Sequence, residues 1–532
     1  MTHDIRLRLS PREAASEELL RSAVASQLDI ASQEINDLRV VRRSIDARQR
    51  HVMVNITARV AIGDTSVVSG GWIQKEFPEV ASSPREVIIV GAGPAGLFAA
   101  LKAIELGIRP IVLERGKDVD SRRLDLADLS RSGCVDPNSN YCFGEGGAGT
   151  FSDGKLFTRS KKRGNVEEIL GLLHQHGASE DILIDSHPHI GSDRLPMIIK
   201  NIRQTILSHG GEVNFCSCVT DILLDEKRNT VDGVVLADGR EYRGPVVLAT
   251  GHSARDVYRM LHSHGVSMTA KGLAIGVRLE HPQKLIDSIQ YHSSEGRGEW
   301  LPPAEYSFVC QSGGRGVYSF CMCPGGVIVP AVSDRGQLVV NGMSASARAS
   351  RHANSGMVVE VRPGDFPEFE SEGNLQMLAL QESLEKRFFD EAGHTINAPA
   401  QRMTDFNAGR QSKNLPPTSY LPGIHSSRLD QLLPPFISDR LREGLRMFGR
   451  RSKGFMSDEA ILVGLESRTS SPVRIPRDRD SLRHVDYAGL YPVGEGAGYA
   501  GGIVSAAIDG QNAMCAVYKA FESGEILSKK GD

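Results

Sequence analysis

Three glycines and one acidic residue form the strongest chemical signal in this sequence. Gly91, Gly93 and Gly96 have the spacing G-x-G-x-x-G, and Glu114 follows 18 residues after Gly96. Glycine at the first two positions allows a tight turn and a close approach of backbone to a pyrophosphate, and the third lets a helix pack against a strand. A carboxylate at the end of the next strand can accept hydrogen bonds from ribose hydroxyls and would repel a 2′-phosphate. The pattern predicts a site for an adenine dinucleotide.

The segments around these residues predict the elements that would hold them in place. Residues 87–90 and 111–113 are apolar runs of strand length, and residues 97–106 carry a helical pattern between them. Strand, glycine turn, helix and second strand form the dinucleotide-binding unit of a Rossmann fold. The first turn of such a helix presents free N–H groups and the positive end of the helix dipole to the phosphates.

A second G-x-G-x-x-G motif, formed by Gly496, Gly498 and Gly501, follows another strand-like segment near the end of the sequence. Only 31 residues remain after Gly501, and a single helix takes up most of them. There is no room for a further strand with a terminal acid, so we do not expect a separate site for NADH. We interpret the motif as the completing piece of the first domain, with a helix that opens near Gly502 and Ile503 and points at the same ligand.

Composition and charge narrow the class of protein. The 532 residues carry a formal net charge of −3, with 62 basic and 65 acidic side chains interspersed. This balance indicates neither a nucleic-acid surface nor a membrane surface. The N-terminal segment is charged and lacks an apolar signal core, and we find no apolar run of 18 residues. We therefore expect a cytoplasmic protein without a membrane span.

Eight cysteines are present, and none of them forms a C-x-x-C pattern. In a chain of this length they do not indicate a disulfide framework. Cys216 with Cys218 and Cys321 with Cys323 form C-x-C pairs. We interpret both pairs as small buried hydrophobic residues, with a redox dithiol or half of a metal site as the alternative for the second pair.

Changes of pattern along the chain predict four parts. Residues 1–82 alternate between strand-like and helical patterns and are expected to form a small N-terminal α/β domain. Residues 83–270 would form the first part of the dinucleotide-binding domain, residues 271–460 an inserted α+β substrate domain, and residues 461–532 the final part of the first domain. We therefore expect an α/β protein whose Rossmann-type domain is assembled from discontinuous segments.

Three motifs resemble known flavoproteins. The segments VGAGPAGLFAA, VVLATG and LYPVGEGAGYAGGI resemble the FAD motifs of flavoproteins of the glutathione-reductase structural type. A closer resemblance, to bacterial FAD-dependent dehydrogenases of unassigned substrate, extends over NYCFGEGGAGTFSDGKLFTR, GHSARD, IGVRLEHPQ, GRGVYSFCMCPGG, HANSGM and ESRTSSPVRI. The resemblance implies a Rossmann-type FAD-binding domain, FAD as the cofactor and an oxidoreductase, and it implies no particular reaction.

The same resemblance implies which residues surround FAD. The first motif would hold the pyrophosphate, Glu114 the adenosine ribose and the backbone of Val219 the adenine, whereas Glu495 stands where the superfamily usually has Asp. The glycine loop of residues 144–155 is placed beside FAD. The expected FAD-binding residues are Gly91, Gly93, Pro94, Ala95, Gly96, Glu114, Arg115, Gly146, Gly147, Gly149, Thr150, Val219, Thr250, Gly251, Gly494, Glu495, Gly501, Gly502 and Ile503.

Candidates for catalysis are weaker. His252 follows the middle motif, and Arg278 and His281 could bind an anionic substrate or transfer a proton, although polar residues satisfied at a domain junction would show the same pattern. Further candidates for the wall of the site, with structural ion pairing as the alternative, are Asp153, Lys155, Glu466, Arg468 and Thr469. His187 and His189 are of the type that ligates metals but have no companion ligand nearby, so we predict no metal site.

These observations predict an FAD-dependent oxidoreductase that moves a hydride through N5 of the flavin to or from an unidentified small substrate. Either NAD(P)H, bound transiently, or the organic substrate itself would be the hydride donor. Two alternatives stay open: a flavoenzyme that acts on RNA with residues 1–82 as the docking module, and a flavin-binding protein without catalysis. The balanced charge makes nucleic acid an unexpected partner, and the sequence does not indicate an oligomeric state.

Overall fold

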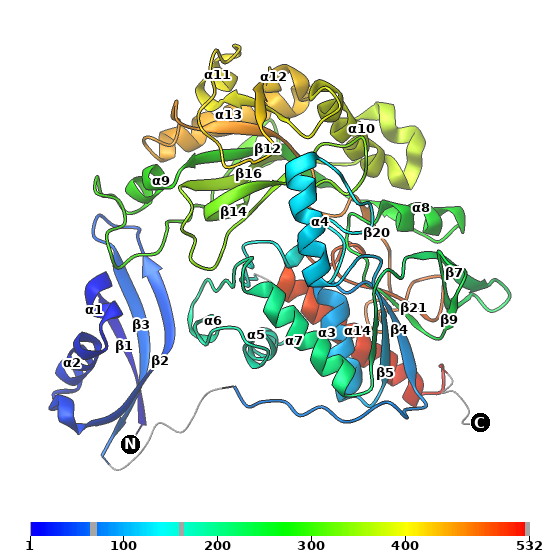
Figure 1. Cartoon of the computed structure of the whole chain (residues 1–532). Coiled ribbons are helices and arrows are strands. Elements are labelled where there is room, and N and C mark those ends of the chain that lie inside the picture. The colour runs from blue at the N-terminus through cyan, green and yellow to red at the C-terminus, as the bar shows by residue number, and fades with distance from the viewer. Residues whose placement is uncertain (1, 64–71, 159–163, 527–532) are drawn as a thin grey trace.

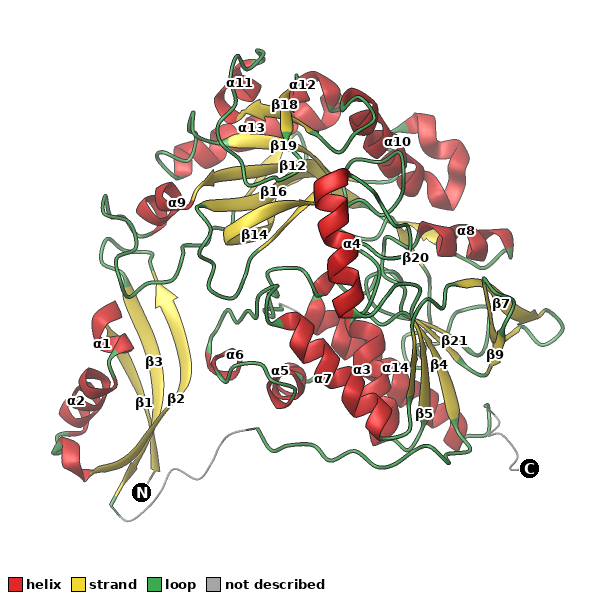
Figure 2. Cartoon of the chain, in the orientation of Figure 1, coloured by secondary structure: helices red, strands yellow, loops and turns green. Residues whose placement is uncertain are grey.

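The computed structural model describes residues 2–63, 72–158 and 164–526. Three regions, each built around its own main β-sheet, are visible in Figure 1, and Figure 2 shows how helices and strands are distributed among them. We call them the N-terminal region, the dinucleotide region and the middle region. Their main sheets have three, five and eight strands within the described residues.

A parallel sheet carries the predicted dinucleotide unit. Its strand order is β21-β10-β4-β5-β6, and all neighbouring strands run parallel. The strands are β4 (Glu86–Val90), β5 (Arg109–Leu113), β6 (Glu212–Asn214), β10 (Val246–Leu248) and β21 (Leu490–Pro492). Segments that are far apart in the sequence therefore lie side by side, which confirms a Rossmann-type fold in discontinuous segments.

The two faces of this sheet are covered differently. Successive residues of a strand point to opposite faces, so Val87 and Ile89 pack into the core under the helices while Ile88 and Val90 pack under a small antiparallel sheet. The helical layer consists of α3 (Pro94–Glu105), α5 (Val166–Gln175), α7 (Leu195–Ser208) and α14 (Ile503–Glu522). The opposite layer consists of β7 (Val219–Asp225), β8 (Thr230–Leu236), β9 (Glu241–Arg243) and α8 (Arg255–Ser263).

The close packing of α14 on α3 depends on a glycine. A Cβ atom added at Gly510 would lie 2.0 Å from the carbonyl oxygen of Ala95, well inside van der Waals contact. The last helix of the chain is thereby pressed against the first helix of the dinucleotide unit. Shorter elements around this core are α4 (Val119–Ser132), the 3-10 turn η2 (Gly147–Gly149) and α6 (Asp181–Ile184).

The middle region is a mostly antiparallel sheet with the order β13-β14-β16-β12-β19-β17-β18, and β15 pairs with β14. Its strands are β12 (Leu273–Pro282), β13 (Val309–Ser312), β14 (Arg315–Pro330), β15 (Val340–Met343), β16 (His352–Val361), β17 (Ala398–Arg402), β18 (Ile424–Ser426) and β19 (Ile461–Glu466). Its helices are α9 (Gln283–Gln290), η3 (Pro367–Leu375), α10 (Gln376–Glu391), α11 (Met403–Ala408), α12 (Leu429–Leu432) and α13 (Pro435–Arg451). The small β11 (Thr269–Ala270) and β20 (Val473–Arg474) pair with each other where the chain enters and leaves this region.

The boundary expected at residue 460 needs a correction. β19 begins at residue 461 and lies between β12 and β17 of the middle sheet, so the chain returns to the dinucleotide region only after this strand. All six residues of β19 are buried, and a strand buried on both faces has the continuous apolar pattern that is typical of a parallel Rossmann strand. The sequence pattern of β19 therefore does not distinguish between the two sheets.

The N-terminal region consists of β1 (Thr2–Leu9), α1 (Pro11–Ala15), α2 (Glu17–Leu28), η1 (Ser32–Glu34), β2 (Ile35–Asp46) and β3 (Met53–Ile62). Ser10 starts α1 with a capping box that includes Glu13, and Pro11 follows at the first helical position. Basic residues of β2 face the dinucleotide region, where Arg43 Nε lies 2.7 Å from Asp185 Oδ1 and Arg39 pairs with Glu180. In the part of the chain that the structure describes, no helix combines the length and hydropathy needed to cross a bilayer.

Candidate functional site

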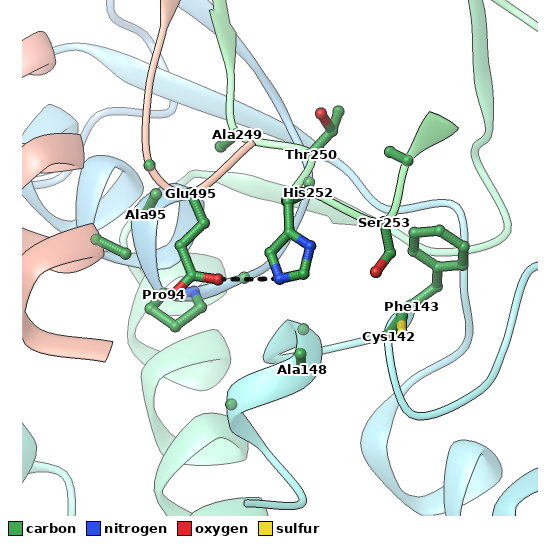
Figure 3. Close-up of a pocket in the computed structure, with 18 of the residues that line it drawn as sticks. Pro94, Ala95, Cys142, Phe143, Ala148, Ala249, Thr250, His252, Ser253 and Glu495 are labelled. Carbon is green, nitrogen blue, oxygen red and sulfur yellow. Dashed lines mark ion pairs between the residues drawn. The ribbon is translucent and has the colours of Figure 1, made fainter. Parts of the chain in front are cut away.

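One cavity of about 390 Å³ lies between the carboxyl end of the parallel sheet and the middle sheet. Figure 3 shows part of it, with Pro94, Ala95 and Ala148 on one side and His252, Ser253 and Glu495 facing them. Most of the predicted FAD-binding residues line this cavity: Gly91, Gly93, Pro94, Ala95, Glu114, Arg115, Gly147, Gly149, Val219, Thr250, Gly251, Gly494, Glu495, Gly501, Gly502 and Ile503. Segments separated by up to about four hundred residues thus meet at one site.

The three glycines of the first motif have different surroundings. Gly91 has φ = 105°, and a Cβ there would lie 2.5 Å from the carbonyl oxygen of Ala249. A Cβ at Gly96 would lie 1.9 Å from the carbonyl oxygen of Gly91. At Gly93, in contrast, the backbone is ordinary (φ = −76°) and the nearest atom to an added Cβ is the Cα of Gly147, at 4.0 Å. Gly91 and Gly96 serve the fold, whereas the missing side chain of Gly93 leaves room in the cavity for a ligand.

Two helices begin at this cavity without help from side chains. α3 starts after Gly93 and α14 starts after Gly502, and neither N-terminus has a side-chain cap among the described residues. The first N–H groups of a helix have no partner within the helix, and the helix dipole is positive at this end. Both starting segments line the cavity, so the site offers anion-binding groups at two separate places. This donor set fits the pyrophosphate and the flavin ring of FAD.

Glu114 has a structural role that the sequence pattern does not reveal. Its carboxylate accepts hydrogen bonds from the backbone N–H groups of Ala92 at 2.8 Å, Gly116 at 2.9 Å and Gly144 at 3.0 Å. It thereby joins the glycine turn, the end of β5 and the loop at residues 144–150. A carboxylate has about four acceptor positions, so one remains for a ribose hydroxyl at the cavity wall.

The remaining predicted FAD residues, Gly96, Gly146 and Thr150, do not line the cavity, and their contacts stabilise the glycine turn and the glycine loop. The backbone N–H of Gly146 donates to the carbonyl oxygen of Ala92 at 2.8 Å, and the hydroxyl of Thr150 donates to the carbonyl oxygen of Glu145 at 2.8 Å. Gly96 belongs to the same group, because it faces the turn at Gly91. These three residues shape the site without facing it.

His252 and Glu495 form a titratable pair in the cavity wall. Figure 3 shows them pointing toward each other, with His252 Nε2 3.6 Å from Glu495 Oε2. Burial, assisted by the positive charge of Arg468, lowers the pKa of His252 to about 4. Burial, assisted by the negative charge of Cys321, raises the pKa of Glu495 to about 7. Near neutral pH the pair therefore consists of a neutral imidazole and a carboxyl group that is able to gain or lose a proton.

The Nδ1 atom of His252 is buried and has no hydrogen-bond partner among the described residues. Buried polar atoms in native proteins are almost always paired, and an exception points to a group that completes the site. Because this atom belongs to a cavity-lining residue, the observation agrees with a bound cofactor or substrate that carries polar atoms. Of the three catalytic candidates, His252 is the one that lines the cavity.

Arg278 and His281 lie elsewhere. Arg278 is fully buried behind the cavity wall, where its guanidinium contacts Asn354 Oδ1 at 2.8 Å and Glu466 Oε2 at 3.3 Å. His281 is fully buried, and its ring packs against Phe455 with 4.7 Å between centroids while Nε2 lies 2.8 Å from the carbonyl oxygen of that residue. Burial lowers the pKa of His281 to about 4, as expected for a neutral core histidine. The placement of His281 argues for packing rather than proton transfer.

Of the other wall candidates, Glu466 does not line the cavity and pairs with Arg278 behind it. Arg468 and Thr469 line the cavity, and so does Lys155, which donates a hydrogen bond to the carbonyl oxygen of Met322. Asp153 also reaches the cavity, but its carboxylate is held by Arg348 with 3.0 Å between Oδ1 and Nε. Among the described residues, no group of three or more His, Cys, Asp or Glu side chains is arranged to hold a metal ion.

Several lining residues were not identified from sequence. They are Cys142, Phe143, Phe157, Ser217, Phe320 and Asn341. Cys142 and Phe143 immediately precede the glycine loop, and this proximity was an available signal. Asn341 lies on β15, which pairs with β14, and no local pattern connects that strand to the dinucleotide unit. The interpretation of the C-x-C pairs as buried also needs correction, because Cys216 is exposed and Cys321 faces the cavity.

Comparison with known proteins agrees with this site. Residues 86–128 match a family model described as an FAD binding domain, residues 272–469 match one described as "FAD-dependent protein, C-terminal domain-like", and residues 1–61 match a domain of unknown function. The second match includes all of β19, in agreement with its place in the middle sheet. An uncharacterized protein of Clostridium beijerinckii is 40% identical over 509 residues, which cover 92% of this chain and 94% of that protein.

Solved structures similar to this chain include several flavoproteins. The flavin-dependent brominase Bmp2 is 13% identical with a TM-score of 0.35, over 84% of this chain and 80% of the other. The 3-ketosteroid-delta4-(5alpha)-dehydrogenase of Rhodococcus jostii RHA1 is 14% identical with a TM-score of 0.33, over 83% of this chain and 100% of the other. From the two FAD family models and the relative that spans nearly the whole sequence, we conclude that the chain belongs to the family of FAD-dependent oxidoreductases, with FAD as its cofactor.

Proposed function

We propose that the protein oxidises or reduces a small polar organic molecule by moving a hydride between that molecule and N5 of FAD. The supporting observation is a single cavity with two kinds of wall. One wall is lined by the glycine turns and helix N-termini of the dinucleotide region, and another by Phe320, Cys321 and Asn341 of the middle region. A cavity shared in this way would hold a substrate against the flavin in a fixed orientation.

The residues of this chain would divide the work as follows. Bound FAD supplies a ring that accepts or releases a hydride. The free N–H groups at the start of α3 would bind the pyrophosphate, and the N-terminus of α14 would stabilise negative charge near the ring. His252 and Glu495 would hold a proton at their facing atoms, Nε2 and Oε2, and exchange it with the substrate. Phe143, Phe157 and Phe320 would exclude water from the reacting atoms.

The hydride donor and the cellular location are also part of the proposal. We favour an organic substrate as the donor, because the dinucleotide-binding segments in the described residues all contribute to one cavity. NAD(P)H would then act only by transient binding to the same cavity. We place the protein in the cytoplasm, since its eight cysteines are all unpaired, as is usual for proteins in a reducing compartment.

A flavoenzyme that docks on RNA through the N-terminal region is the weaker alternative. Strand β2 of this region is rich in arginine, but Arg39 and Arg43 pair with Glu180, Asp181 and Asp185 of the dinucleotide region. Charges that are engaged within the chain are less able to attract phosphates. We therefore propose a small molecule, rather than nucleic acid, as the partner, and salt-sensitive retention of the intact protein on RNA would argue against this choice.

The cofactor site is tested by adding one methyl group. Gly93→Ala should leave the fold intact, because its backbone is ordinary and its Cβ would meet open space, yet the methyl group would lie where the pyrophosphate approaches. We expect FAD binding to weaken at least about tenfold, or about 1.4 kcal/mol. The matched control is Gly316→Ala, whose Cβ would make only ordinary contacts, the nearest at 3.6 Å, outside the cavity. Equal flavin content in both variants would show that FAD is not bound at this turn.

Turnover needs a separate measurement. The yellow holoenzyme is mixed anaerobically with NADH, NADPH and a panel of small hydroxy acids, alcohols and amines, and the visible absorbance of the flavin is followed. Bleaching by an organic molecule would support the proposal, and bleaching by a reduced nicotinamide alone would move the donor role to NAD(P)H. If FAD binds but nothing in the panel bleaches it, the alternative of a flavin-binding protein without catalysis gains support.

A further inference from the structure

The pair Cys321 and Cys323 occupies an irregular point of the middle sheet. Both residues belong to β14, whose pairing with β16 shifts register between Phe320 and Cys323. Cys321 has φ = 45°, in the left-handed region that residues with side chains rarely adopt. Such conformations persist where the surrounding structure imposes them, and they concentrate at functional sites. The irregular backbone turns Cys321 toward the cavity, while Cys323 lies fully buried behind it.

A buried cation holds this pair in place. Arg278 Nη2 donates to the carbonyl oxygen of Cys321 at 2.7 Å and lies 3.3 Å from Cys323 Sγ. Lys155 supplies a second cation through its hydrogen bond to the carbonyl oxygen of Met322, the residue between the two cysteines. A cysteine pair beside two cations is the environment in which a thiolate is stabilised. Arg278 does not line the cavity, and its role is to hold the two cysteines in place.

The two thiols also act on each other. Cys323 Sγ lies 3.4 Å from the carbonyl oxygen of Cys321, within hydrogen-bond distance for sulfur. A second hydrogen bond, between the two cysteine side chains, together with the charges of Arg278 and Lys155, lowers the pKa of Cys321 against the effect of burial. This hydrogen bond between the side chains, followed by burial, raises the pKa of Cys323. One thiolate that faces the cavity and one protonated thiol behind it is the arrangement of an attacking and a resolving cysteine.

Cys321 also faces the flavin end of the cavity. Its negative charge is the second cause, after burial, of the raised pKa of Glu495 in the terminal glycine motif. Phe320 and Cys321 line the same cavity as Gly501, Gly502 and the start of α14. The sulfur and the segment proposed to stabilise the flavin ring therefore lie at one end of the site.

We propose that Cys321 and Cys323 form a redox-active dithiol that exchanges two electrons with FAD. In the forward direction the Cys321 thiolate and the Cys323 thiol form an S–S bond, and the two electrons and the Cys323 proton pass to FAD, which becomes FADH⁻. In the reverse direction the disulfide is reduced to one thiolate and one thiol, and FAD is regenerated. This inference rests on the proposed function, because it requires FAD in the cavity, and it deepens that function by naming a thiol or disulfide compound as the second substrate class.

An anaerobic reductive titration of the full-length holoenzyme with dithionite tests the electron count. We expect the air-oxidised wild type to take up four electrons per FAD, two for the flavin and two for the disulfide. Cys321→Ser and Cys323→Ser should each take up two. The matched control is Cys134→Ser, which changes an exposed cysteine that does not line the cavity and should keep the count at four. The flavin absorbance of every variant before titration reports separately whether FAD is bound.

A thiol count gives an independent readout. Trypsin releases residues 316–335 as a peptide that contains Cys321 and Cys323 and no other cysteine, and residues 298–315 as a peptide that contains only Cys310. Denaturation in iodoacetamide should leave the first peptide unlabelled in oxidised enzyme and doubly labelled after reduction, whereas the Cys310 peptide is labelled in both states. Two electrons per FAD in the wild type, with both thiols labelled in air-oxidised enzyme, would overturn the dithiol proposal while leaving the proposed function intact. Colourless wild-type protein would instead overturn the FAD site on which both proposals depend.

Discussion

Glu385 joins two buried arginines from different parts of the chain, and replacing it by glutamine should loosen both. Its carboxylate accepts hydrogen bonds from Arg255 Nη2 at 2.7 Å and from Arg468 Nη2 at 2.8 Å, and it is fully buried. Arg255 opens α8 in the dinucleotide region, Glu385 lies on α10 of the middle region, and Arg468 lines the cavity. Glutamine keeps the shape but removes the charge and turns an N–H group toward guanidinium groups that can only donate.

The pKa of Glu385 gives the magnitude. Burial alone would raise this pKa, but the charges of Arg255 and Arg468 outweigh burial and lower it from 4.5 to about 2. The difference corresponds to about 3 kcal/mol in favour of the folded, charged form. Because the folded pKa is the lower one, this stabilisation is complete above pH 4.5 and is lost as the pH falls from 4.5 through about 2. We expect Glu385→Gln to lower the free energy of unfolding by about 3 kcal/mol at neutral pH.

Thermal unfolding followed by circular dichroism measures this effect. At about 2 cal/mol/K per residue, unfolding of the 532-residue chain as one unit changes the entropy by about 1 kcal/mol/K, so Tm should fall by about 3 °C. The matched control is Asp390→Asn on the same helix α10, where an exposed carboxylate pairs with exposed Lys386 and is worth less than about 1 kcal/mol. Equal shifts for the two variants, or a Glu385→Gln deficit that does not shrink toward about pH 3, would refute the reasoning.

Two further substitutions test the cavity wall and the helix packing. Glu495 has a folded pKa of about 7 against a usual 4.5, so the stability it contributes is present below pH 4.5 and is lost as the pH rises through 7. Because its side chain is 31% exposed, we expect Glu495→Gln to raise the free energy of unfolding of FAD-free protein by only about 1 kcal/mol above pH 7 and to leave it unchanged near pH 4.5. A gain in thermal stability that does not depend on pH would contradict this. Gly510→Ala places a Cβ 2.0 Å from the carbonyl oxygen of Ala95 and should cost about 1–3 kcal/mol and much of the bound FAD, whereas unchanged Tm and flavin content would show that α14 is free to shift away from α3.

The dinucleotide unit could be predicted because its signals are local. Gly96 faces the carbonyl oxygen of Gly91 and Glu114 binds the N–H of Ala92, so both contacts lie within one strand–turn–helix–strand segment, and the positive φ of Gly91 belongs to the turn of that same segment. Gly93 could be predicted for the same reason, because its missing side chain leaves space for a ligand and its role does not depend on a distant contact. Short-range turn chemistry of this kind is visible in sequence spacing alone.

Residues whose role depends on distant partners could not be placed in this way. Arg278 has the residue type of an anion-binding group, but its anion is Glu466, 188 positions away in the chain, and its further contacts come from β14 and β16. Asn341 reaches the cavity only because β15 pairs with β14. Pairing between strands is a tertiary property, and propensity or hydrophobic period does not specify it.

The division of the cavity also indicates where substrate selectivity resides. The wall from the dinucleotide region is formed by backbone N–H groups and by glycines, which recognise phosphates without discriminating among substrates. The wall from the middle region is formed by Phe320, Cys321 and Asn341. Residues outside the cavity hold the groups around it, because Arg278 binds the carbonyl oxygen of Cys321 and Glu385 binds Arg468. Because Glu385 holds Arg468 by an ion pair outside the cavity, the Arg468 side chain keeps its geometry when the ligand changes. A fixed polar group of this kind discriminates among ligands, because a ligand that does not pair with it leaves a buried polar group without a partner. Selectivity among relatives should therefore vary with β14, β15 and their buried supports, while the glycine turn at residue 91 stays the same.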